Sequence, residues 1–126
     1  MNEGGLGDRD LVGRLVRASR WLAPVCLAVI VVLSIVPAEQ RPHTGMSGNL
    51  EHFLAYAGTG VALVSAIRAH RVALATLLLC VLSGGLEIAQ IWIPGRSAGL
   101  DNWIASSAGA LVGSFLAYLL LTRVRR

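Results

Sequence analysis

The residues best suited to chemistry stand near the ends of long apolar runs. His52 follows Glu51 at the start of one run, and Tyr56 comes four residues later. That spacing places His52 and Tyr56 on one face of a helix. Glu87 and Gln90, three residues apart in the next run, share a face in the same way. Ionisable side chains within a membrane span are costly, so these residues are functional candidates by default.

A second polar group follows Pro94, at the end of the run that carries Glu87. With a rise of about 1.5 Å per residue, Glu87 lies roughly 10 Å from that end of its helix. An antiparallel bundle would therefore bring both polar groups into one cavity that is open to the outside. The predicted ligand-binding residues are His52, Tyr56, Glu87, Gln90, Arg96, Asp101 and Asn102.

Two interpretations of this group remain open. In a catalytic one, Glu87 acts as general base with its pKa raised by burial, and His52 is its partner. In a structural one, Glu87 pairs with Arg96 or His52 and only holds the helices together. The residue types fit both interpretations.

Other chemistries have weaker support. The group offers a single suitable histidine, so no metal site is predicted, and no cofactor is implied. Ser97, Ser106 and Ser107 lie nearby, but no nucleophile elbow surrounds them, and serine in a helix usually serves packing. Cys26 and Cys80 lie inside apolar runs, where cysteine packs as a small hydrophobic residue.

Long apolar runs must position these residues. The chain has 126 residues, of which 55% are hydrophobic and only 14% are charged, too few to cover a soluble domain. Four runs are long enough, or nearly so, to cross a bilayer as helices. We therefore predict an all-α membrane protein, an antiparallel bundle of four transmembrane helices. The runs are Trp21–Val36, Leu50–Ile67, Val72–Ile93 and Trp103–Thr122.

The basic residues, all of them arginine, indicate the orientation. Four precede the first run, two separate the second from the third, and three follow the fourth, which puts nine on one side against Arg41 and Arg96 on the other. This bias predicts that both termini lie on the cytoplasmic side of a bacterial inner membrane. The arginines lie between apolar runs and not on a patch with aromatic residues, so nucleic acid is not an expected partner.

Three segments follow from this pattern. Residues 1–20 form a short basic amphipathic segment suited to anionic headgroups, residues 21–122 form the transmembrane domain, and residues 123–126 form a basic tail. The first run is short, and a signal peptide is an alternative for it. Gly109 and Gly113 form a GxxxG pattern, which predicts close helix packing or a homodimer contact.

The motifs around these polar residues resemble those of the VanZ-like family. Glu87-Ile-Ala-Gln90, then Pro94-Gly-Arg96, match its E-x-x-Q and P-x-R pattern, and His52 to Tyr56 match its H-x-x-x-Y segment. The resemblance covers about residues 30–115. Where the family has Asp and then Asn, this chain has Asn102 and Ser106, which leaves open whether Asp101 or Asn102 fills the acidic position.

The resemblance implies a function at the cell envelope, because the family is named after a teicoplanin-resistance protein. The first hypothesis is a protein that binds an amphipathic or lipid-linked ligand, such as a wall precursor or a glycopeptide, beside membrane lipids. Arg96 would then meet an anionic group. The alternatives are a membrane enzyme that acts on a lipid-linked substrate and a small dimeric transporter.

Overall fold

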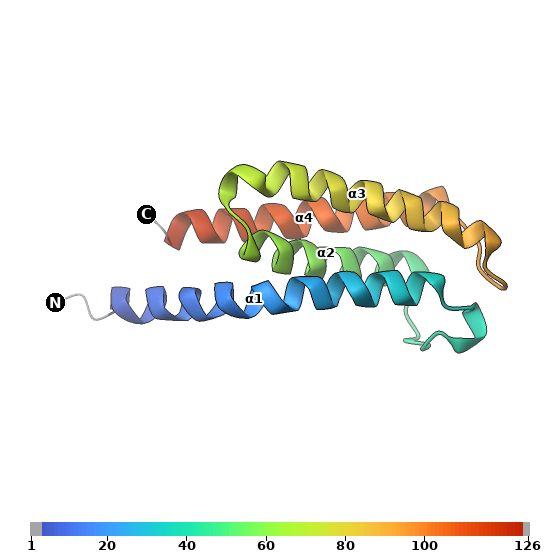
Figure 1. Cartoon of the computed structure of the whole chain (residues 1–126), viewed down its shortest axis with the longest axis horizontal. Helices are drawn as coiled ribbons and strands as arrows, with labels where there is room; N and C mark the ends of the chain where they lie inside the picture. The colour runs from blue at the N-terminus through green and yellow to red at the C-terminus, as the bar shows by residue number, and fades with distance from the viewer. Residues whose placement is uncertain (1–3, 125–126) are drawn as a thin grey trace.

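The structure, a computed structural model, describes residues 4–124, which form four long helices in an antiparallel bundle (Figure 1). They are α1 (Gly4–Ile35), α2 (Gly48–Ala66), α3 (Val72–Ala89) and α4 (Leu100–Val124). Both described ends of the chain lie at one end of the bundle, the terminal end. Residues 36–47 and 93–99 connect helices at the opposite end, the loop end. The predicted all-α bundle is confirmed.

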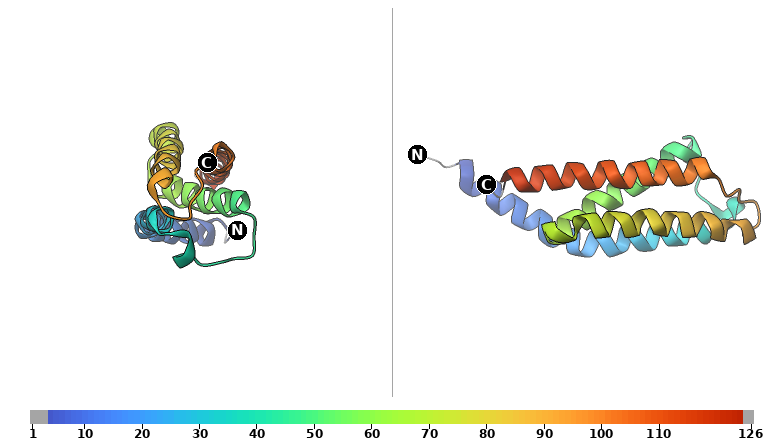
Figure 2. Two further views of the ribbon diagram at one scale, coloured as in Figure 1. Left: turned by 90° about the vertical axis from the view of Figure 1, so that its right-hand side faces the viewer. Right: turned by 90° about the horizontal axis from the view of Figure 1, so that it is seen from above.

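Three segments are long and apolar enough to cross a membrane: Asp10–Ile35, Ala69–Trp92 and Leu100–Val124. The helix α2 does not reach that hydropathy, because Glu51, His52 and several glycines dilute its apolar residues. It nevertheless runs from the loop end back to the terminal end, and its 19 residues extend over about 28 Å. Contacts with α1 on one side and α4 on the other make α2 the central helix (Figure 2).

The helix α1 does not break between the predicted basic segment and the first apolar run. It continues for 32 residues and includes Pro24, and its N-terminal part bends out of line with the rest of the helix, toward the side on which α4 lies (Figure 2). Proline lacks the N–H that would close the preceding turn, which explains a bend there. Residues 1–3 of the predicted basic segment and Arg125 and Arg126 of the predicted tail lie outside the described residues.

Small residues allow α2 and α4 to approach backbone to backbone. A Cβ atom at Gly109 would overlap the carbonyl oxygen of Phe53, and one at Gly113 would overlap that of Ala57. The GxxxG pattern thus packs against α2 of the same chain. A homodimer through these glycines would have to displace α2, and the dimer itself stays a prediction.

Two turns shape the loop end. Gly45 and Gly95 have positive φ values of 77° and 73°, a conformation that residues with a side chain rarely adopt. A backbone hydrogen bond of 3.5 Å from Ala38 N to Pro94 O joins the two loops. Because Gly95 directly precedes Arg96, this turn fixes where the guanidinium of Arg96 lies.

Candidate functional site

A polar cavity of about 470 Å³, the polar chamber, lies at the loop end of the bundle. The loop of residues 36–47 forms one wall, and the first turns of α2 and the loop of residues 93–99 form the others. Four predicted ligand-binding residues line the chamber: His52, Gln90, Arg96 and Asn102. The other three residues predicted for the same cavity, Tyr56, Glu87 and Asp101, do not line it.

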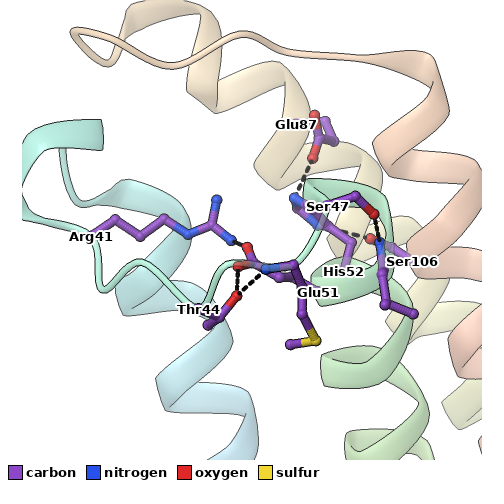
Figure 3. Close-up of polar contacts among 9 residues, drawn as sticks. Arg41, Thr44, Ser47, Glu51, His52, Glu87 and Ser106 are labelled. Atoms are coloured by element: carbon purple, nitrogen blue, oxygen red, sulfur yellow. Dashed lines mark hydrogen bonds and ion pairs between the residues drawn. The ribbon is translucent and has the colours of Figure 1, made fainter.

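His52 is the best-connected side chain of the site. Its Nδ1 atom lies 3.2 Å from Oγ of Ser106 on α4, and its Nε2 atom lies 3.8 Å from Oε1 of Glu87 on α3 (Figure 3). The imidazole thus connects three helices. Ser106 has no exposed surface, so its hydroxyl orients the imidazole and cannot meet a ligand. From the sequence, Ser106 was expected only to serve packing, although it stands where the resembled family has Asn.

Glu87 is buried behind His52 and does not line the polar chamber. Its Oε2 atom accepts a hydrogen bond of 3.0 Å from the backbone N–H of Gly99. The carboxylate therefore ties α3 to the loop that leads into α4. Of the two partners predicted for Glu87, His52 lies beside it, whereas no ion pair joins it to Arg96 within residues 4–124.

Glu51 holds the long loop against the bundle. Its carboxylate pairs with the Arg41 guanidinium and accepts a hydrogen bond from the Thr44 hydroxyl (Figure 3). Ser47 caps α2 by accepting a hydrogen bond of 3.4 Å from Leu50 N. Sequence reasoning did not place Arg41 or Glu51 in the ligand site, yet both line the chamber. Their separation by ten positions gave no local signal.

Two further polar groups of the chamber lack partners. The guanidinium of Arg96 makes no ion pair or hydrogen bond with any side chain that the structure describes. Gln90 is 2% exposed, and its Nε2 atom has no hydrogen-bond partner in that part of the chain. Unsatisfied buried polar groups are rare in proteins, so each calls for an explanation.

Asn102 and Asp101 take different places. Asn102 lines the chamber, whereas Asp101 is exposed and accepts a hydrogen bond of 3.2 Å from Nδ2 of Asn49. Asn102 therefore holds the position that faces the chamber.

An apolar groove of about 240 Å³ continues from the polar chamber between α1 and α2. Its walls include Val29 and Leu33 of α1 and Leu54 of α2, together with the buried Tyr56. Arg41, Glu51, His52 and Arg96 line both the groove and the chamber, so the two cavities are continuous. Tyr56 therefore belongs to the groove and not to the chamber.

Within the described part of the chain, no three His, Cys, Asp or Glu side chains gather closely enough to hold a metal ion. The ionisable groups of the site engage one another or line the chamber instead. The arrangement is suited to the recognition of a polar group.

Comparison with known proteins gives one match. Neither the curated proteins nor the solved structures contain a match to this chain. The sequence model of the VanZ/LLP1 family matches residues 17–121. This range includes α1 from Arg17 onward, all of α2 and α3, nearly all of α4 and every residue of the polar chamber. The chain belongs to the VanZ/LLP1 family.

Proposed function

We propose that this chain is a membrane protein of the cell envelope that binds the polar part of an amphipathic or lipid-linked ligand in the polar chamber. The unpaired guanidinium of Arg96 carries the proposal. Arginine recognises carboxylates and phosphates with two parallel hydrogen bonds, and charge-assisted bonds of this kind are strong. An unpaired arginine in the wall of a cavity is therefore suited to an anionic ligand.

The electrostatics around Arg96 support an anion. Partial burial and then the nearby Arg41 guanidinium lower the pKa of Arg96, which means that both disfavour its charged form. An anionic group bound beside Arg96 would compensate for the lost hydration and the repulsion. The charged side chains that line the chamber, histidines aside, are Arg41, Arg96 and Glu51, so cations exceed anions there.

A binding measurement with Arg96→Ala tests this function. The purified full-length protein is mixed with lipid-linked wall precursors or with glycopeptides, and the affinity of the variant is compared with that of the parent. Arg68→Ala is the matched control, because Arg68 is exposed at the terminal end. We expect Arg96→Ala alone to weaken binding by about 1.5–3 kcal/mol, the usual contribution of a hydrogen bond to a charged group. Equal affinity of all three proteins would exclude the assignment.

The proposed function requires the chamber to face away from the cytoplasm. The arginine bias of the sequence supports this orientation, with both termini inside a bacterial inner membrane. His43 and His70 form a matched pair for a test, because both are exposed and lie at opposite ends of the bundle. A membrane-impermeant thiol reagent should label His43→Cys in intact cells and His70→Cys only after permeabilisation. The reverse pattern would place the chamber in the cytoplasm.

An effect on teicoplanin susceptibility is the physiological part of the proposal. The basis is the family to which the chain belongs. Expression of the parent protein in a susceptible bacterium should raise the inhibitory concentration of teicoplanin, and expression of Arg96→Ala at the same level should not. An inhibitory concentration that the parent protein leaves unchanged would exclude an effect on teicoplanin susceptibility. Ligand binding in the chamber would still be decided by the binding measurement.

A membrane enzyme is the second candidate, and the contacts of His52 favour it. His52 lines the chamber while Glu87 lies behind it at 3.8 Å and Ser106 fixes the other ring nitrogen. A base that acts on a bound ligand would therefore be His52, which would accept the ligand's proton at Nε2, and the Glu87 carboxylate would stabilise the imidazolium that forms. Incubation with lipid-linked substrates should then yield a product that Glu87→Gln and His52→Ala both abolish. A product formed equally by Glu87→Gln would rule out this role of Glu87.

A further inference from the structure

The polar chamber and the apolar groove share part of their walls, so a single molecule could occupy both. The chamber offers Arg96 and Gln90, whereas the groove offers Val29, Leu33 and Leu54. These three apolar side chains are 38–48% exposed, and in a bilayer such exposure means contact with lipid chains. A polar cavity that opens sideways into lipid is complementary to a molecule with a charged head and an apolar chain.

We propose that the two cavities form one site for a lipid with a phosphate headgroup, which enters sideways from the bilayer between α1 and α2. This inference rests on the proposed function. It adds the chemical class of the headgroup, the position of the acyl chain and the route by which the lipid enters. The phosphate lies in the chamber against Arg96, and the first part of the acyl chain lies in the groove between α1 and α2.

Gln90 gives the second contact to the headgroup. Its side chain is almost fully buried, lines the chamber and has a free Nε2 donor among the described residues. A buried donor without a partner costs free energy, which a phosphate oxygen would recover once the Gln90 amide turns toward the chamber. Arg41 contributes less, because its guanidinium already pairs with Glu51.

A substitution that fills the groove but leaves the chamber unchanged tests whether the acyl chain of the lipid lies in the groove. Ala55 is an exposed residue of α2 that lines only the groove, so Ala55→Phe should obstruct it. Ala28→Phe is the matched control, since Ala28 is exposed on α1 and lines neither cavity. Val29→Phe obstructs the groove from the α1 side and serves if Ala55→Phe fails to fold.

The measurement uses the full chain in nanodiscs of phosphatidylcholine that contain phosphatidic acid as a minor component. Native mass spectrometry counts the phosphatidic acid retained by each variant, and thermal unfolding confirms that each variant is folded. We expect the parent and Ala28→Phe to retain it. Ala55→Phe, Val29→Phe and Arg96→Gln should each lower the affinity about tenfold, equivalent to about 1.4 kcal/mol. Gln90→Met, which removes the donor at similar volume, should lower it less than Arg96→Gln.

The outcomes separate the two proposals. In one outcome, Ala55→Phe and Val29→Phe retain phosphatidic acid as well as Ala28→Phe does, whereas Arg96→Gln loses it. The acyl chain then does not lie in the groove, and the proposed function stands. Full displacement of phosphatidic acid by millimolar inorganic phosphate would show a site filled from water and overturn sideways entry. Retention that is unchanged in Arg96→Gln would overturn the proposed function as well.

Discussion

The Nε2 atom of His52 lies 3.8 Å from Oε1 of Glu87, and the other carboxylate oxygen of Glu87 accepts a hydrogen bond of 3.0 Å from Gly99 N. One buried acid therefore supports both the imidazole that lines the chamber and the loop that carries Arg96. Glutamine in place of Glu87 keeps an oxygen that can accept the Gly99 hydrogen bond but removes the negative charge beside His52. The structural contribution of Glu87 can therefore be separated from any chemical one.

Replacement of Glu87 should distinguish these contributions. Glu87→Gln keeps a carbonyl oxygen for the Gly99 N–H, whereas Glu87→Ala leaves that donor without its partner. We expect Glu87→Ala to lower the free energy of unfolding by about 1–3 kcal/mol, with a smaller loss for Glu87→Gln. Hydrogen exchange at the Gly99 amide should accelerate in Glu87→Ala only. Equal acceleration in both variants would contradict the proposed hydrogen bond.

Contact between α2 and α4 should tolerate no side chain at Gly113. A Cβ atom there would overlap the carbonyl oxygen of Ala57, so Gly113→Ala forces the two helices apart. We expect a loss of about 1–3 kcal/mol in stability, the usual cost of overpacking. Thermal unfolding in detergent measures it. Gly58→Ala is the control, because its new methyl group would meet open space, and it should leave stability unchanged or raise it.

The indole of Trp103 should contribute more to stability than that of Trp92, although both lie near the loop end. Trp103 donates a hydrogen bond of 3.0 Å from Nε1 to the carbonyl oxygen of Cys80, which joins α4 to α3. Trp92 is 76% exposed and lies at the end of the short helix η3 (Gln90–Trp92). Trp103→Phe should lose about 1 kcal/mol in stability.

Trp92→Phe provides the comparison for this hydrogen bond, since it removes the same N–H group from an exposed position. Thermal unfolding of both variants under one condition checks the difference. A larger loss for Trp92→Phe would mean that the contact between Trp103 and Cys80 contributes little.

The ion pair between Arg41 and Glu51 should control the loop of residues 36–47 more than global stability. Both side chains are partly exposed, and exposed ion pairs typically contribute about 0–1 kcal/mol. Glu51→Gln should therefore change the unfolding temperature little. Limited proteolysis should nevertheless cut the loop faster, because the carboxylate also accepts from Thr44. Glu39→Gln, in the same loop, is the control and should show the parent rate.

How much the sequence predicted varies with the element. The helices at Trp21–Val36, Val72–Ile93 and Trp103–Thr122 follow from long, predominantly apolar runs, and three segments of the structure are indeed long and apolar enough to cross a membrane. The run at Leu50–Ile67 forms a helix too, but its hydropathy is lower because Glu51, His52 and several glycines dilute its apolar residues. The GxxxG pattern predicted close packing correctly, and only the structure identified α2 as the partner.

The sequence by itself determined the four helices, their antiparallel order and the end at which the polar residues gather, because apolar runs and helical periodicity are local properties. Which side chains meet depends on how the helices rotate about their axes and how the loops fold, and these are properties of packing. Only the tertiary structure therefore placed Ser106 against His52, set Glu87 behind His52 and outside the chamber wall, and joined the chamber to the groove between α1 and α2.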